Sequence, residues 1–159
     1  MGLFDSMVKS LQGDVELMAI SDVQGVAIID ALVAAMFVDG IAEAHELAEF
    51  EKQMNGIPWA QRKGDAEKKR LATEAMARVK EASASRTAAT WFLTTMAKNL
   101  GTQTLREKVY KMAVSICAAD RQASPQEQAL LGNLANAFGL SEARAKELMQ
   151  PVLKQLGLA

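Results

Sequence analysis

The sequence predicts an all-α fold, a bundle of seven or eight helices, and three observations lead to this prediction. Half of the 159 residues are hydrophobic but only 5% are aromatic, so the core must consist mainly of Ala, Leu, Val, Ile and Met. Apolar residues recur at helical spacing along most of the chain. Gly, Ser and Pro stand where these apolar segments begin and end, as is typical of helix boundaries. A chain of this length is expected to form one domain, residues 1–159.

The first helices are predicted from amphipathic spacing and a capping signal. Residues 3–11 are expected to form a short amphipathic helix, which a linker to residue 19 separates from the core at 20–155. Ser21 and Gln24 form a capping box that opens a second helix, running to about residue 38. This second helix is apolar on most sides and is therefore expected to be central and buried.

The middle of the chain is predicted to contain four further helices. The first covers residues 43–54, and the second is a long, charged surface helix over 59–83. Ser85 is expected to cap the next helix, which Gly101 ends. Another core-facing helix follows over about 104–119.

The last two helices have strong boundary signals. Ser124-Pro125-Gln126-Glu127 combines a capping Ser, a Pro at the first helical position and a Glu three residues after the cap. The helix that it opens is expected to run to Phe138, where Gly139 closes it. Ser141 is expected to cap the final helix, which Pro151 bends or ends.

The sequence also contains an internal repeat. Residues 34–40 align with residues 115–121, so that Asp39 and Asp120 occupy the same position in the two copies. A glutamate follows each aspartate seven residues later, at Glu46 and Glu127. The repeat predicts two pseudosymmetric units, each consisting of a helix, an acidic turn and a second helix.

This doubled pattern resembles the TerB family, which is associated with tellurite resistance, and the related domain of membrane-anchored DnaJ-like co-chaperones. The likeness covers roughly residues 20–155 and is carried by two motifs: Met36-Phe37-Val38-Asp39-Gly40 with Glu46, and Ala118-Ala119-Asp120 with Ser124-Pro125-Gln126-Glu127. The resemblance implies a seven-helix fold with internal pseudosymmetry. It also implies a bacterial stress-response role linked to metal ions or toxic oxyanions, with no established catalytic activity.

The two acidic turns are the candidate functional site. Because a carboxylate at the C-terminal end of a helix faces the negative end of the helix dipole, both aspartates need a compensating charge. A divalent cation such as Ca²⁺ or Mg²⁺, which prefers oxygen ligands, would supply it. The predicted ligands are Asp39, Glu43, Glu46, Asp120 and Glu127. A purely structural interpretation stays open, in which Glu127 completes a capping box and Asp39 forms an Asx-type turn before Gly40.

Composition argues against several other functions. The formal net charge of -1 provides no global field for holding nucleic acid. The single histidine, His45, and the single cysteine, Cys117 in a buried apolar run, do not suit a zinc or copper site. Nucleophile motifs and Gly-rich phosphate loops are missing from the sequence, so an enzyme is not expected.

The sequence also leads to general expectations about localisation and partners. The chain has neither a membrane-spanning apolar run nor a secretory signal, which favours the cytoplasm. Protein partners in a stress-response or membrane-associated complex are expected. An alternative function is a scaffold without metal that docks on a partner or on the inner face of the membrane. Its docking surface would be the N-terminal helix or the basic stretch 62–81, although mixed charge there also fits a solvated helix face.

Overall fold

The structure is a computed structural model that describes residues 19–37, 54–55, 57–118, 125–155 and 157. These residues form seven α-helices and no β-strand, which confirms the predicted all-α fold. The helices are α3 (Asp22–Phe37), α5 (Pro58–Gln61), α6 (Asp65–Ala82), α7 (Arg86–Leu100), α8 (Gln103–Cys117), α9 (Pro125–Ala137) and α10 (Glu142–Gln155). The predicted helices over residues 3–11 and 43–54 lie outside the described residues, except for Met54.

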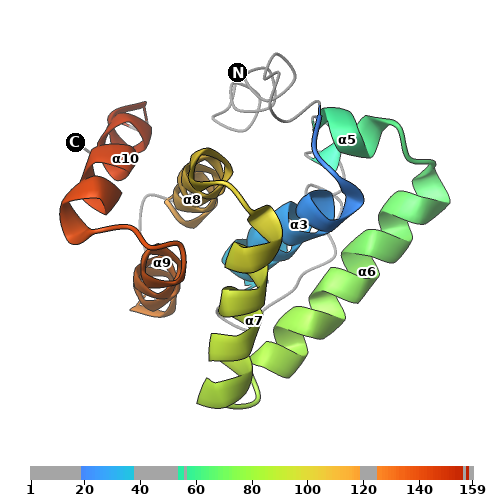
Figure 1. The fold of residues 1–159 in the computed structure, drawn as a ribbon, viewed down its shortest axis with the longest axis horizontal. Helices are drawn as coiled ribbons and strands as arrows, with labels where there is room; N and C mark the ends of the chain where they lie inside the picture. Colours follow the sequence, from blue (N-terminus) through green and yellow to red (C-terminus); the bar gives the residue numbers. More distant parts are fainter. Residues whose placement is uncertain (1–18, 38–53, 56, 119–124, 156, 158–159) are drawn as a thin grey trace.

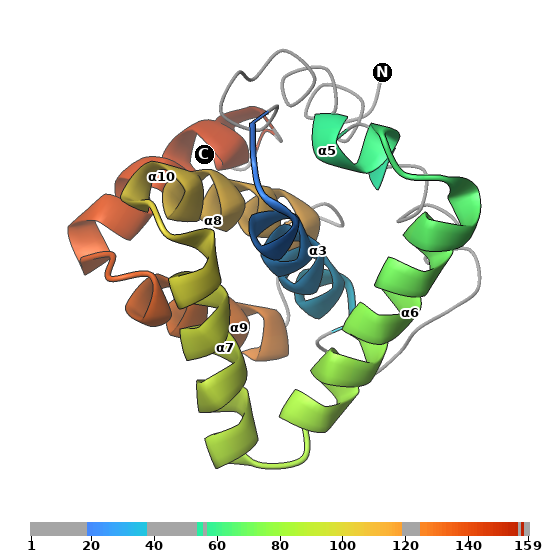
Figure 2. The same cartoon turned by 45° about the vertical axis from the view of Figure 1, so that its right-hand side comes forward.

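Helix α3 is the central helix, as predicted. It packs against α6, α7 and α8, which surround it in Figures 1 and 2. Ile28, Ile29 and Val33 are at most 1% exposed. The predicted capping box is also present, because the Gln24 backbone N–H donates to Ser21 Oγ (3.2 Å) and the Ser21 N–H donates to Gln24 Oε1 (2.9 Å). Sequence periodicity and capping therefore located this helix correctly.

The single helix predicted over residues 59–83 is wrong, because the chain forms two helices there. Helix α5 ends at Gln61, and α6 starts only at Asp65, after Gly64 in an extended conformation. Gly64 lacks the side chain that would favour a continuous helix, and two acidic residues in the first turn of α6 suit the positive end of the helix dipole. The continuous run of charged residues concealed this boundary in the sequence.

The starts of α7 and α10 follow the predicted caps. Ser85 Oγ accepts from the Ala88 N–H (3.0 Å) at the start of α7, and Ser141 Oγ accepts from the Arg144 N–H (3.1 Å) at the start of α10. Helix α8 begins slightly earlier than predicted because Thr102 caps it. Helix α9 ends at residue 137, one residue before the predicted end.

The ends of α7 and α10 differ in how closely they match the prediction. Gly101 adopts a φ of 82°, a left-handed conformation that glycine favours, and it ends α7 as expected. Pro151, in contrast, lies inside α10, which continues to Gln155. Proline removes one backbone hydrogen bond but does not end a helix that is held by buried residues on both sides of it, here Leu148 and Val152.

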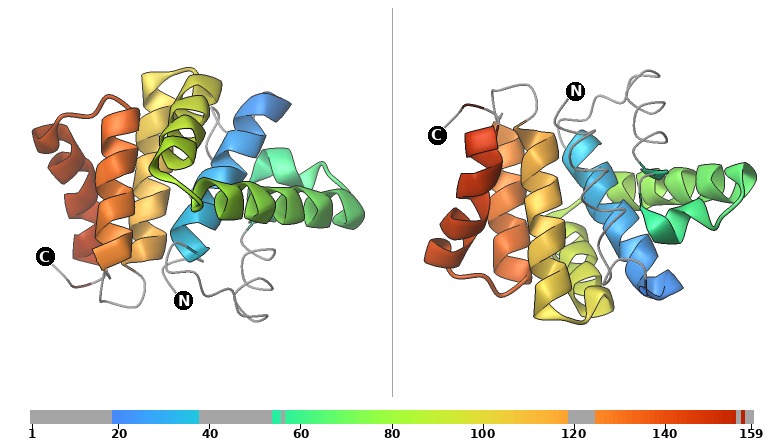
Figure 3. Two further views of the ribbon diagram at one scale, coloured as in Figure 1. Left: turned by 90° about the horizontal axis from the view of Figure 1, so that it is seen from below. Right: turned by 90° about the horizontal axis from the view of Figure 1, so that it is seen from above.

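Helices α3 and α8 lie side by side and run in the same direction, as both views in Figure 3 show. Helices α9 and α10 pack on the other side of α8. None of the helices in the described ranges is long and apolar enough to cross a membrane.

Candidate functional site

The predicted cation ligands fall mostly outside the described residues. Asp39, Glu43, Glu46 and Asp120 lie there, as does His45. Glu127 is described: it is half-buried in the first turn of α9. Its predicted capping partner, Ser124, lies outside the described residues.

The helix ends that precede the two acidic turns lie at the same end of the molecule. Helix α3 ends at Phe37, and α8 ends at Cys117, with Ala118 as its C-cap. Because the two helices are neighbours that run in the same direction, their C-terminal ends point the same way (Figure 3). Each of these ends carries the partial negative charge of a helix dipole, so positive charge is favoured beside them.

Within the described ranges, no three side chains of His, Cys, Asp or Glu come together as a metal site would require. Cys117, which the sequence placed in a buried run, is indeed fully buried in the core. A thiol in such surroundings is inert packing rather than a ligand or nucleophile. The chemistry expected of the acidic turns therefore depends on residues beyond those described, together with Glu127.

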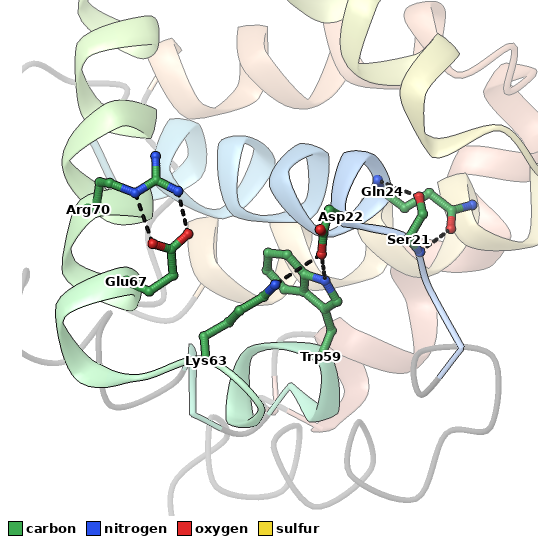
Figure 4. A network of polar contacts seen from close by, with 7 residues as sticks. All are labelled: Ser21, Asp22, Gln24, Trp59, Lys63, Glu67 and Arg70. Atoms are coloured by element: carbon green, nitrogen blue, oxygen red, sulfur yellow. Dashed lines mark hydrogen bonds and ion pairs between the residues drawn. The ribbon is translucent and has the colours of Figure 1, made fainter.

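A polar network connects the start of α3 to α5, and the sequence did not reveal it. Asp22 accepts hydrogen bonds from Trp59 Nε1 (2.9 Å) and Lys63 Nζ (3.0 Å), as Figure 4 shows. The Lys63 ammonium also lies 5.0 Å from the centre of the Trp59 ring. The hydrogen bonds from Trp59 and Lys63 hold the pKa of the Asp22 carboxyl below its usual value. This network orients Trp59 against α3.

The basic stretch over residues 62–81 is a surface of mixed charge. Arg70 forms ion pairs with Glu67 and with Glu74, the latter at 2.7 Å (Figure 4 shows the pair with Glu67). Lys63 forms an ion pair with Asp22. Because these cations already have acidic partners, the solvated interpretation of this stretch fits better than an anion-binding face.

A second missed contact is the ion pair of Asp30 with Arg78. Asp30 is only 8% exposed in the middle of α3, and its two carboxylate oxygens accept from the Arg78 guanidinium at 2.7–3.1 Å. Burial raises the pKa of Asp30, against the opposing effect of Arg78. The signal was available in the sequence, since a lone aspartate in an otherwise apolar helix requires a partner.

Trp91 is the most exposed large hydrophobic side chain among the described residues. The sequence placed it on one helix with Phe92, Met96 and Leu100. Those three are buried, but Trp91 is 71% exposed on the outer face of α7. A tryptophan in this position offers an apolar contact to another molecule.

Comparison with known proteins agrees with the predicted family and with the all-α fold. A family model described as "Tellurite resistance protein TerB" matches residues 25–150. The match covers most of α3, continues to most of α10 and includes the residues of both predicted acidic turns. Searches of curated proteins and of solved structures found no match.

Proposed function

Since this chain belongs to the TerB family, we propose that it is a non-enzymatic stress-response module that binds a divalent cation and contacts partner proteins. The proposed ion is Ca²⁺ or Mg²⁺, because only oxygen ligands are offered. Its proposed ligands are Asp39, Glu43, Glu46, Asp120 and Glu127.

The observation that carries this proposal is the common direction of α3 and α8. Asp39 follows Phe37 by two residues, and Asp120 follows Ala118 by two residues. Two residues of chain span at most about 7 Å, so we expect each aspartate to lie close to the end of its helix. Both carboxylates are therefore expected at one end of the bundle, where the partial negative charges of the two helix ends add to their own. A divalent cation would relieve this accumulation of negative charge.

Calorimetric titration tests the cation. The wild-type protein is titrated with Ca²⁺ and with Mg²⁺ and compared with an Asp39→Asn, Asp120→Asn double variant. We expect saturable binding to the wild type and an affinity at least about tenfold weaker in the double variant, because two charged ligands are lost. A matched control, Asp65→Asn with Glu81→Gln, changes the net charge equally on α6 and should bind as the wild type does.

Two results would contradict the cation. One is the absence of binding heat and of any thermal shift in the wild type. The other is an equal affinity in the wild type and in the double variant. Either would favour the structural interpretation of the turns.

Partner contact has its own supporting observation, the exposed Trp91. Tryptophan is enriched among residues that dominate protein interfaces. We propose that Trp91 faces a partner protein. The test is cross-linking of the Trp91→Ser variant in its host cell. The control is Val23→Ser, because Val23 is the other strongly exposed apolar side chain among the described residues. Cross-linked species that disappear only in Trp91→Ser support this role, and an unchanged pattern contradicts it.

A further inference from the structure

An apolar groove runs between α9 and α10, with α8 as its floor. The two outer helices both pack on α8 but make few contacts with each other, and the space between them is about 590 Å³. Small-molecule pockets in proteins are roughly 300–1,000 Å³ in volume and predominantly apolar. The apolar side chains of this groove include Val114, Leu131, Leu140, Met149 and Leu153.

Gly132 holds the groove open on the α9 side. A Cβ added there would meet no described atom within 4 Å. Glycine within a helix is unfavourable relative to alanine, and here no neighbouring helix approaches closely enough to require it. The missing side chain leaves room along the groove.

Tyr110 supplies a buried polar group without a hydrogen-bond partner among the described residues. It lines the groove and is only 2% exposed, yet its hydroxyl makes no hydrogen bond within the part of the chain that the structure describes. A buried hydroxyl without a partner is costly, and a ligand acceptor would satisfy it. Burial, with the nearby Cys117, raises the pKa of Tyr110, so the phenol is a neutral donor at physiological pH.

Most of the polar groups that line the groove lie toward one end of it. The Glu107–Arg144 ion pair (2.7 Å) joins the early turns of α8 and α10. Tyr110 and Lys146 follow that pair within one turn on each helix, so both lie toward this end, where Lys146 is 3.7 Å from Glu142. The opposite end is lined by Cys117 and Leu153, together with Gln128 in the first turn of α9, which already has a partner. The groove is thus mostly apolar, and the polar groups that a ligand could reach lie toward the end with Tyr110 and Lys146.

We propose that this groove binds a fatty acyl chain, with the hydrocarbon lying between α9 and α10 and the carbonyl oxygen accepting a hydrogen bond from Tyr110. A linear amphiphile matches a mostly apolar groove whose polar groups available to a ligand lie toward one end. Lys146 at the rim is available to an anionic carboxylate in exchange for Glu142. The ligand is either a free fatty acid or the acyl chain of a membrane lipid. Cation binding at the acidic turns is not needed, so the titrations contain a chelator.

The first experiment is calorimetric titration with sodium dodecanoate below its critical micelle concentration. The wild type is expected to bind one equivalent saturably. Gly132→Leu fills the groove and should weaken binding at least about tenfold, whereas Asn133→Leu, the next residue on the exposed outer side of α9, should leave it unchanged. Ala135→Leu, on the same wall as Gly132, is a second filling variant in case Gly132→Leu unfolds. Absence of saturable binding to the wild type, or equal affinity in the folded filling variants, would overturn the proposal.

Tyr110→Phe tests the polar end, since it keeps the ring and removes only the hydroxyl. Loss of one hydrogen bond should weaken dodecanoate about fivefold. An unchanged affinity would overturn the placement of the carbonyl beside Tyr110.

Co-sedimentation with phosphatidylcholine vesicles separates the two sources of the acyl chain. Binding of the wild type but not of Gly132→Leu supports a membrane lipid. Dodecanoate binding without co-sedimentation supports a free fatty acid.

Discussion

Two helix glycines, Gly25 in α3 and Gly132 in α9, stand in opposite surroundings. A Cβ on Gly25 would lie 2.5 Å from atoms of the Trp59 ring, far inside van der Waals contact. A Cβ on Gly132 would meet no described atom within 4 Å. The first glycine permits close packing, and the second leaves space. The region around α3 is therefore filled to contact, whereas the region between α9 and α10 is left open.

The arrangement of the helices explains this difference. Helix α3 contacts α6, α7 and α8, so nearly every direction from its axis meets another helix. Helix α8 is covered by α9 and α10, which make few contacts with each other. The two apolar helices that the predicted repeat pairs, α3 and α8, thus lie in unequal surroundings: α3 is central to the core, and α8 forms the floor of a groove.

Among the changes that test this difference between the two regions, the largest effect is expected from breaking the ion pair in the filled region. Arg78→Met leaves the Asp30 carboxylate buried without its partner and should lower the free energy of unfolding by about 2–3 kcal/mol at neutral pH. The estimate is below the usual cost of breaking a buried pair because the Arg78 side chain is 36% exposed. Urea unfolding of both proteins measures it.

The loss of stability in Arg78→Met should depend on pH. Burial raises the pKa of Asp30, and removing Arg78 removes the opposing effect, so the folded pKa rises further above the unfolded value. A carboxyl group whose pKa is raised on folding destabilises the folded protein. This destabilisation is fully present above the folded pKa and is lost as the pH falls through it. The deficit of Arg78→Met should therefore shrink from neutral pH toward about pH 5. A deficit that stays constant would show that lost packing, rather than the buried charge, is its cause.

Gly25→Ala tests close packing directly and should lower the free energy of unfolding by about 2 kcal/mol. The new methyl group collides with the Trp59 ring, which is 3% exposed and is held in place by its hydrogen bond to Asp22. Thermal unfolding, read together with tryptophan fluorescence, should show a lower melting temperature and an altered environment of Trp59. A Gly25→Ala, Trp59→Leu double variant should lose less than the sum of the single changes, since the collision is removed.

Local sequence signals predicted the helices of this fold better than they predicted the contacts between the helices. Capping at Ser21, Ser85 and Ser141 depends on neighbouring residues, so the sequence shows it directly. The contact of Trp59 with Asp22 joins residues 37 positions apart, and tertiary packing determines it. The boundary at Gly64 was missed because charged residues on both sides looked like one continuous helix.

The candidate site was predicted from the repeat, and most of it remains a prediction. The repeat predicts two related helix ends, and the helices that precede them, α3 and α8, run in the same direction. Of the five predicted ligands, Glu127 alone lies within the described residues. The groove between α9 and α10 had no sequence signal, because it arises from how the two helices diverge over α8.

Gly132→Ala makes the same substitution in the open region that Gly25→Ala makes in the filled region. It should stabilise the protein by about 0.5–1 kcal/mol. Alanine favours the helix, and open space accommodates its methyl group. The same Gly-to-Ala change is thus expected to have opposite signs in the two regions. A destabilised Gly132→Ala variant in urea unfolding would mean that the groove is filled in solution.

The smallest effect is expected at Trp91. Because this side chain is 71% exposed, Trp91→Ser should change the free energy of unfolding by no more than about 0.5 kcal/mol, as for most surface substitutions. Serine and tryptophan also have similar helix propensities, so α7 itself should not weaken. Phe92→Ala, at the next residue on the buried side of the same helix, should cost about 3 kcal/mol in the same measurement. If the two variants lost similar stability, Trp91 would be packed in solution and unavailable to a partner.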